Sequence, residues 1–269
     1  MAARYIVGVL GAPIAIYLVY RGGLLFAAAL AALAAIGGFE YTRLAQMKSW
    51  KPSPPVLMGG ALLFMLDASL FGGKFSEPAL ALVLLAGLSV QVMRGIPANG
   101  VGGPALETFG AIYCGWTLSK LLLIRTQYGD AGFGLAMGVL VVVWMGDLGA
   151  FFTGIKFGRT KLAPALSPRK TVEGAVGGAV WSLTGSAVFK LLGDATGLWY
   201  TLEWPHALTL AALLSLSGQI GDLAESAMKR DAGVKDAGRL FPGHGGVLDR
   251  FDSLLFASPV AYYYIRLVL

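Results

Sequence analysis

Carboxylates, cations and glycines that could bind a phosphate compound gather between Ser226 and Asp252, in the stretch SAMKRDAGVKDAGRLFPGHGGVLDRFD. Five glycines in this loop let backbone N–H groups approach a ligand closely, and the basic side chains favour an anionic ligand. Asp222 lies in the apolar run that precedes the loop, and Asp249 lies at the start of the apolar run that follows it. Carboxylates on two helices beside a glycine-rich basic loop predict a site for a metal-bound phosphate compound.

Asp222 is the first candidate for chemistry. It lies eight residues before Arg230, which places it about 12 Å from the end of its helix at 1.5 Å per residue. A carboxylate inside a membrane helix costs roughly 2.5–3.5 kcal/mol on the insertion scale, so it should face a polar cavity or a partner. A structural ion pair is the alternative, but Glu225 and Ser226 share its helix face and favour a functional role.

Asp249 and Asp252 stand three residues apart in the first turn of the last apolar run. Carboxylates there also cap free N–H groups, so one of the two is open to a capping role. Mg²⁺ is commonly held by one or two carboxylates together with substrate phosphates, so Asp222 and Asp249 suffice as its protein ligands. Asp252 and Asp147 are the further metal candidates, and bonding to a neighbouring helix is the less favoured alternative for Asp147.

A second basic loop covers residues 157–174, FGRTKLAPALSPRKTVEG. Thr171 is predicted to cap the helix that follows, with Glu173 in its first turn. Helix N-termini attract phosphate, and Arg169 or Lys170 could hold a triphosphate or a lipid phosphate. Plain anchoring to anionic lipids is the alternative for these cations.

Composition sets the class of protein. Of 269 residues 56% are hydrophobic and only 13% are charged, against about 25% charged in soluble domains. The chain is therefore predicted to be an all-α polytopic integral membrane protein. The net charge of +6 suits anionic lipids or substrates but is too diffuse for nucleic acid binding, and the single cysteine, Cys114, excludes an internal disulfide.

A bilayer core takes roughly 20 helical residues, and by that measure the chain has about nine transmembrane helices. The first apolar run could pass for a signal peptide, but no cleavage-like site precedes a polar region, so it is interpreted as a span. Ionisable residues concentrate late in the chain, so residues 1–128 are expected to form a scaffold and residues 129–269 the chemical half. The predicted spans are 5–20, 23–45, 55–72, 76–94, 105–125, 132–156, 172–192, 206–229 and 250–269.

Basic residues predict the orientation. With the loop from Ser226 to Asp252 in the cytoplasm, most of the 21 Lys and Arg residues fall on the cytoplasmic side. We therefore expect a multi-pass protein of the cell inner (plasma) membrane, with its N-terminus and both basic loops cytoplasmic.

The long loop resembles the C-terminal motif of the CDP-diacylglycerol synthases, or phosphatidate cytidylyltransferases. Asp147 and the stretch from Ser167 to Gly174 resemble that family's second characteristic region, with Arg169 and Val172 as mild departures. The matching residues in the loop are Ser226, Lys229, Arg230, Lys235, Asp236, Gly238, the stretch from Pro242 to Gly246, Asp249, Arg250 and Asp252.

The resemblance implies the reaction of CTP with phosphatidate (phosphatidic acid) to give CDP-diacylglycerol and pyrophosphate, catalysed by a nine-helix homodimer embedded in membrane lipids. It implies Mg²⁺ held by Asp222 and Asp249, with K⁺ as a possible second ion. Lys229, Arg230, Lys235 and Arg239 would bind phosphate, and Ser167 and Ser226 would line the substrate cavity. Other motif residues expected on the substrate side are Arg169, Lys170, Thr171, Asp236, His244, Gly245 and Gly246.

Three other classes can be weighed from the residues themselves. A cation-coupled transporter using Asp147 and Asp222 would explain the intramembrane carboxylates but not the basic glycine-rich loop, and no internal repeat is visible. A CDP-alcohol phosphotransferase would arrange its aspartates in another order, DGxxAR…GxxxD…D, which the residues around Asp222 and Asp249 do not follow. A non-catalytic scaffold would leave the buried carboxylates without a role.

Overall fold

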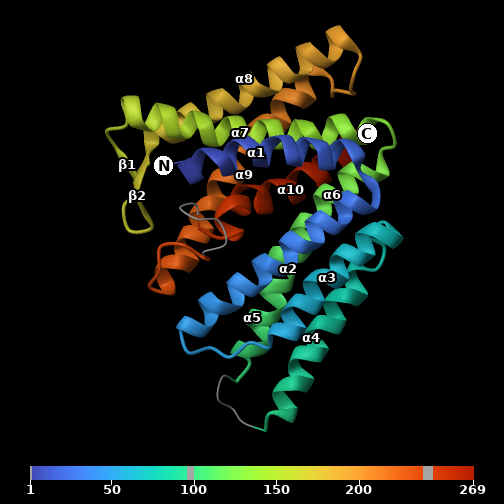
Figure 1. The fold of residues 1–269 in the computed structure, drawn as a ribbon, viewed down its shortest axis with the longest axis vertical. Coiled ribbons are helices and arrows are strands. Elements are labelled where there is room, and N and C mark those ends of the chain that lie inside the picture. Colours follow the sequence, from blue (N-terminus) through green and yellow to red (C-terminus); the bar gives the residue numbers. More distant parts are fainter. Residues whose placement is uncertain (1, 96–99, 239–244) are drawn as a thin grey trace. The chain divides into compact units, whose positions relative to one another are not determined.

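The computed structural model describes residues 2–95, 100–238 and 245–269, with side chains from residue 11 onward, and the described chain is largely helical (Figure 1). Two short strands, β1 (Lys161–Ala163) and β2 (Ser167–Thr171), accompany the helices. The helices are α1 (Ala2–Arg21), α2 (Gly23–Met47), α3 (Pro54–Phe71), α4 (Ser76–Met93), α5 (Gly102–Ala111), the π-helical turn η1 (Ile112–Trp116), α6 (Thr117–Gln127), α7 (Ala131–Phe157), α8 (Val172–Thr196), α9 (Trp204–Asp231) and α10 (Leu248–Val268).

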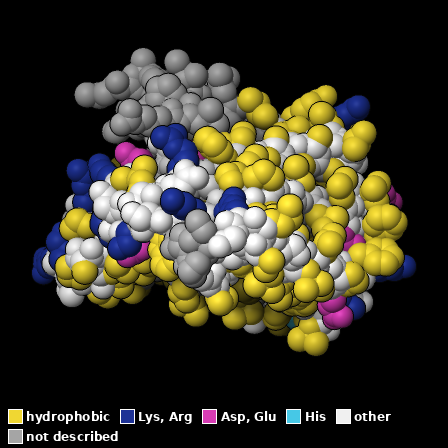
Figure 2. All heavy atoms as spheres, turned by 90° about the horizontal axis from the view of Figure 1, so that it is seen from below, with side chains coloured by type: hydrophobic (Ala, Val, Ile, Leu, Met, Phe, Trp, Pro, Cys, Tyr) yellow, Lys and Arg dark blue, Asp and Glu magenta, His cyan; other side chains and the backbone are white. Residues whose placement is uncertain are grey.

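Helices occupy each of the nine predicted ranges. Within the described residues, six are long and apolar enough to cross a membrane: α2, α3, α4, α7, α8 and α9. Hydrophobic side chains cover broad areas of the face in Figure 2. Among the large hydrophobic side chains, Leu24 is 81% exposed and Phe151 is 61% exposed. These features confirm an all-α polytopic membrane protein, while nine crossings stay a prediction.

The predicted span 105–125 is helical but is not one continuous α-helix. The π-helical turn η1 separates α5 from α6. Within this turn Gly115 packs directly on α3, since a Cβ at Gly115 would lie only 2.4 Å from the Cα of Ala61. The glycine therefore permits a helix contact that any larger residue would prevent.

The basic loop at 157–171 contains a β-hairpin that the sequence analysis did not predict. Its antiparallel strands pair Lys161 with Thr171 and Ala163 with Ser167. The turn is closed by the N–H of Leu166, which donates to the Ala163 carbonyl at 3.1 Å. The hairpin gives this loop a fixed course into α8.

Thr171 caps α8 as predicted. Its side-chain oxygen accepts a hydrogen bond from the N–H of Gly174 at 3.1 Å. Glu173, in the first turn, accepts from the backbone N–H groups of Arg159 at 3.0 Å and Thr160 at 3.1 Å. Cap and carboxylate thus join the start of α8 to the start of the hairpin.

The chain divides into two compact units. Residues 1–123 group with residues 228–251, and residues 124–227 group with residues 252–269. Helices α9 and α10 therefore contribute to both units. The expected division into a scaffold and a chemical half concerns function and stays a prediction.

Each unit packs through small residues. In the first unit, Phe64, Val83 and Ala111 belong to a buried cluster of α3, α4 and α5, and Gly60 leaves room for Val83. In the second unit, a Cβ at Gly146 would lie 2.5 Å from Ser182 Oγ, and one at Gly174 would lie 2.9 Å from the Ala150 carbonyl. Small residues therefore let α7 and α8 pack closely.

Candidate functional site

Asp249 is the centre of the site in the first unit. Its Oδ1 lies 2.6 Å from Nζ of Lys229, and both side chains are about nine-tenths buried. Its Oδ2 accepts hydrogen bonds from the backbone N–H groups of Ala237 at 2.8 Å and Gly246 at 2.7 Å. Three donors therefore hold one carboxylate and fix its direction, which suits a group that must present charge at a defined place.

The chain between α9 and α10 turns immediately after the basic end of α9. The N–H of Val234 donates to the Lys229 carbonyl at 2.9 Å, and the guanidinium of Arg230 donates to the Val234 carbonyl at 2.8 Å. Gly233 takes a positive φ of 72°, which ends the helix. Arg230 consequently shapes the turn, a role the sequence analysis did not assign to it.

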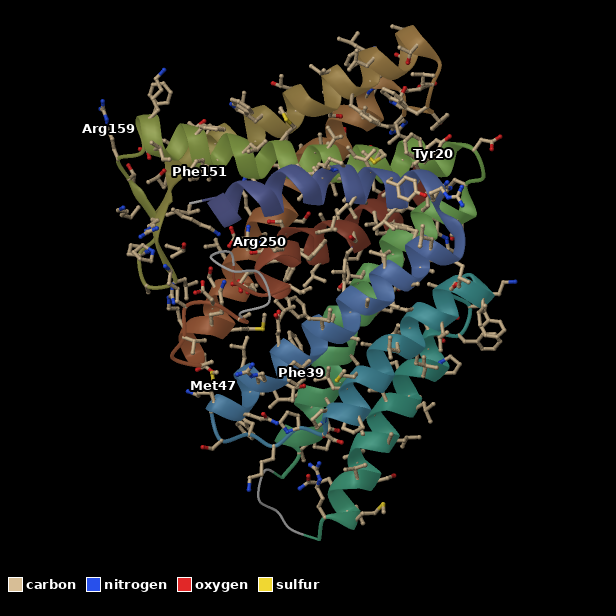
Figure 3. The ribbon with its side chains drawn as sticks, viewed as in Figure 1. Tyr20, Phe39, Met47, Phe151, Arg159 and Arg250 are labelled. Carbon is tan, nitrogen blue, oxygen red and sulfur yellow. The ribbon has the colours of Figure 1, made fainter. Side chains whose placement is uncertain are left out.

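The other predicted phosphate-binding residues of this loop are either exposed or outside the described residues. Lys235 and Asp236 are exposed, as is Arg250 at the start of α10 (Figure 3). Arg239 and His244 lie outside the described residues, so their predicted roles stay predictions.

Gly245 and Gly246 lie directly against Asp249. Gly245 has a φ of +84°, and a Cβ there would meet Asp249 Oδ2 at 2.5 Å. Gly246 donates its N–H to the same oxygen. Both glycines are therefore required by geometry, because a side chain at Gly245 would strain the backbone and displace the carboxylate.

Glu40 is a residue of this site that the sequence analysis left in the scaffold. It is a buried carboxylate on α2, and it accepts the N–H of Val247 at 3.0 Å and that of Leu248 at 2.9 Å. The available sequence signal was its position inside a long apolar span, where an acidic residue requires a polar partner or marks a functional site. Its partners, more than 200 residues away in the sequence, could not be inferred.

Asp222 is the centre of the site in the second unit. Its Oδ2 lies 2.5 Å from Nζ of Lys170, which comes from strand β2, and both side chains are about a quarter to a third exposed. The hairpin and the Thr171 cap place Lys170 just before α8. Ser167 in the same strand is half-buried and Arg169 is exposed, while Ser226 on α9 is buried.

Asp252 is influenced electrostatically by three other carboxylates of the second unit. Asp252 lies within electrostatic range of Asp222, Glu225 and Asp147. The hydroxyl of Ser253 donates to Oδ1 of Asp147 at 3.3 Å, and this is the interhelical bond that the sequence analysis considered for Asp147. Anionic groups concentrated in this way are stabilised by cations, of which Lys170 is one.

Helices α9 and α10 can approach closely here because α9 carries glycine. A Cβ at Gly221 would lie 2.6 Å from the carbonyl oxygen of Asp252 and 3.0 Å from Phe256. Gln219 also joins α9 to α8, because its amide donates to the Ala175 carbonyl at 3.1 Å. These contacts fix the helix that carries Asp222.

The donor set fits a hard divalent cation. Carboxylate oxygens are the ligands that Mg²⁺ prefers, and one or two of them suffice when substrate phosphates complete the coordination. Within the described ranges no three His, Cys, Asp or Glu side chains are grouped to hold a metal on their own. Asp222 and Asp249 belong to different units, so their sharing of an ion stays a prediction.

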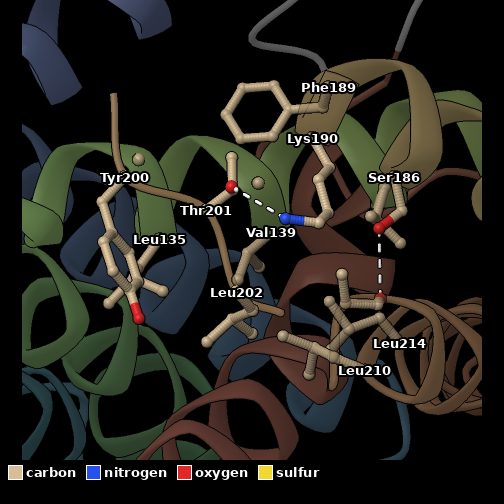
Figure 4. A pocket seen from close by; sticks show the side chains of 14 residues that line it. Leu135, Val139, Ser186, Phe189, Lys190, Tyr200, Thr201, Leu202, Leu210 and Leu214 are labelled. Atoms are coloured by element: carbon tan, nitrogen blue, oxygen red, sulfur yellow. Dashed lines mark hydrogen bonds between the residues drawn. The ribbon is translucent and has the colours of Figure 1, made fainter. Parts of the chain in front are cut away.

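A pocket in the second unit lies away from these charged groups. It is lined mainly by apolar side chains from the start of α7, the end of α8 and the start of α9 (Figure 4). Lys190 in its wall donates to Thr201 at 3.4 Å and pairs with Asp194 at 2.9 Å. Leu214 in the lining stands eight residues before Asp222, about 12 Å along α9. This pocket is therefore separate from the predicted site.

The arrangement as a whole pairs acids with ammonium groups. A Lys–Asp pair can serve polyanion chemistry in two ways, because the ammonium can bind phosphate and the carboxylate can bind a metal ion. The pairs Lys170–Asp222 and Lys229–Asp249 each join residues far apart in the sequence. No strong general base is needed by such a site when the nucleophile is already an anion.

Comparison with known proteins agrees with this chemistry. The model of the cytidylyltransferase family matches residues 2–268. A phosphatidate cytidylyltransferase of Bacillus subtilis is 37% identical over 277 residues, covering 99% of this chain and 98% of that protein. Another from Synechocystis is 33% identical over 298 residues, covering 99% and 97%, and one from Brucella melitensis is 37% identical over 264 residues, covering 97% and 92%. From end to end, then, the chain belongs to the cytidylyltransferase family.

Proposed function

We propose that this membrane protein is a phosphatidate cytidylyltransferase, which converts CTP and phosphatidate into CDP-diacylglycerol and pyrophosphate. The relatives that carry this name align with nearly the whole chain. The structural observation that carries the proposal is that both aspartates singled out from the sequence, Asp222 and Asp249, are paired with lysine ammonium groups. The transporter alternative finds no support among the relatives.

The reaction is an in-line displacement at phosphorus. A phosphate oxygen of phosphatidate attacks the α-phosphorus of CTP, and the bond from that phosphorus to the bridging oxygen of the β-phosphate breaks. Pyrophosphate leaves with the electron pair of that bond. Because the attacking phosphate is already anionic, the protein's tasks are to bring two polyanions together and to stabilise charge.

The described residues suit these tasks. Lys170 is presented by the hairpin at the start of α8, beside a helix N-terminus that itself attracts phosphate. Lys229 is held on the last turns of α9 by Asp249, so its ammonium is fixed in direction before substrate arrives. Exposed Arg169 and Lys235 add positive charge for the approach of CTP.

Mg²⁺ belongs to this proposal, with Asp222 and Asp249 as its ligands and Asp147 and Asp252 as further candidates. When bound, the ion would polarise the transferring phosphoryl group and neutralise charge on pyrophosphate. K⁺ as a second ion, a homodimer, and an inner-membrane location with cytoplasmic loops complete the proposal. The basic residues in both loops support that orientation.

Radiolabelled CTP incubated with phosphatidate and the detergent-purified protein tests the function directly. We expect a labelled lipid with the mobility of CDP-diacylglycerol, formed only when Mg²⁺ is present. Absence of that lipid at every Mg²⁺ concentration, with protein that is folded by circular dichroism, would refute the proposal. Uptake of ions by vesicles containing the protein, without labelled lipid, would favour the transporter.

A further inference from the structure

A buried carboxylate of α2 holds the start of α10. Each oxygen of Glu40 accepts one backbone N–H, Oε1 from Val247 at 3.0 Å and Oε2 from Leu248 at 2.9 Å. The first N–H groups of a helix lack partners within the helix, and they are usually satisfied by a residue close by in the sequence. Here the partner comes from a helix 207 residues earlier.

Two glycines of the loop leave space for this carboxylate. A Cβ at Gly238 would lie 2.1 Å from Glu40 Oε1, and one at Gly246 would lie 2.3 Å from the same oxygen. Neither distance is possible for real atoms, so only glycine fits at these two positions while Glu40 keeps its place. Gly238 and Gly246 therefore both lie directly against the carboxylate.

The same turn of chain holds Asp249. The N–H of Gly246 donates to Asp249 Oδ2, and the next two N–H groups, those of Val247 and Leu248, donate to Glu40. Three consecutive peptide groups are thus fixed by two carboxylates. A shift of this turn would change the direction of Asp249 and, through their 2.6 Å contact, that of Lys229.

We propose that Glu40 is a positioning residue of the cytidylyltransferase site: by binding the first N–H groups of α10, it fixes the direction of Asp249. The inference rests on the proposed function, because Asp249 belongs to that site. It assigns a role in the reaction to a helix of the part expected to be only a scaffold.

Glu40→Gln tests the proposal by replacing one acceptor oxygen with an NH₂ donor that faces a backbone N–H. We expect kcat to fall roughly 10- to 100-fold, the range typical of lost support behind a site residue, with KM for CTP changed less than about threefold. Hydrogen–deuterium exchange at Val247 and Leu248 should speed up at least tenfold. Glu107→Gln is the matched control, since Glu107 is equally buried in the first unit but bonds to the N–H of Ser53.

Glu40→Asp separates positioning from packing. Aspartate keeps both acceptor oxygens but is shorter, whereas glutamine fills the same space without the second acceptor. A positioning role predicts more activity in Glu40→Asp than in Glu40→Gln, and a packing role predicts the reverse. The aspartate variant also carries the test if the glutamine variant does not fold.

The outcomes are distinguishable. Unchanged kcat, or unchanged exchange at Val247 and Leu248, in Glu40→Gln would overturn the role of Glu40. An equal loss of kcat in Glu107→Gln would also overturn it, since burial rather than the bond to α10 would then be the cause. Failure of the unaltered protein to form CDP-diacylglycerol would instead refute the proposed function, and the exchange measurement would still report on the anchoring of α10.

Discussion

Removing the charge of Asp249 should affect stability and activity by very different amounts. In Asp249→Asn, Lys229 loses a partner at 2.6 Å in a site where both side chains are about nine-tenths buried. The amide keeps one acceptor oxygen, which in the Oδ2 position accepts both the Ala237 and the Gly246 N–H, and its NH₂ group then faces the Lys229 ammonium. Breaking one side of a buried ion pair costs about 3 kcal/mol at the lower end of measured values.

That loss of stability leaves the protein folded. Proteins unfold with free energies of about 5–15 kcal/mol, so after a cost of about 3 kcal/mol about 2–12 kcal/mol remains, and even about 2 kcal/mol is a folded excess of about 30-fold. Unfolding would then remove only a few per cent of the activity. A fall in CDP-diacylglycerol formation of 100-fold or more must therefore come from the site itself.

Thermal unfolding in detergent measures the loss of stability. Turnover of labelled CTP, at a temperature well below the unfolding transition, measures the loss of activity. Lys229→Met should cost a similar amount, and the double variant about 3–4 kcal/mol rather than the sum of the two single values, because the pair is already broken. Asp231→Asn is the control, since Asp231 forms a largely exposed ion pair with Lys48 at 3.1 Å that is worth less than about 1 kcal/mol. Turnover within tenfold of the unaltered protein in Asp249→Asn, or additive costs in the double variant, would refute the reasoning.

Three further predictions concern the second unit and the ion. Asp222→Asn should abolish detectable turnover yet change stability by less than about 1 kcal/mol, because its pair with Lys170 is partly exposed; a large shift in melting temperature would contradict this. Gly221→Ala should destabilise the protein by about 1–3 kcal/mol in a melting assay, because the new Cβ would meet the Asp252 carbonyl at 2.6 Å. Gly59→Ala is the control and should be neutral or slightly stabilising in the same assay, because the space around Gly59 is open. Chelation by EDTA should stop turnover and added Mg²⁺ should restore it; turnover that survives chelation would exclude the ion from the proposal.

The helices and one cap were predictable because their signals are local. Long apolar runs located each helix to within a few residues. Thr171 was identified as a cap from the residues beside it alone. Periodicity and capping depend on neighbours within a few positions, so one sequence suffices for them.

The hairpin and the partners of the charged groups were not predictable. Strands of three and five residues without alternation carry no periodic signal, which is why the segment 157–171 was expected to be a plain loop. Lys170 and Asp222 were both candidate site residues with separate expected roles, since nothing in a 52-residue separation indicates a contact at 2.5 Å. Glu40 fell within the expected scaffold, residues 1–128, and its partners could not be inferred for the same reason.

The bond between Glu40 and α10 has a consequence for biogenesis. The ribosome adds about 5–20 residues per second, so Val247 emerges roughly 10–40 s after Glu40 has been made. Throughout that interval α2 carries a carboxylate whose final partners do not yet exist, and water or another polar group must solvate it. Insertion of α10 is therefore also the step that gives Glu40 its hydrogen-bond partners.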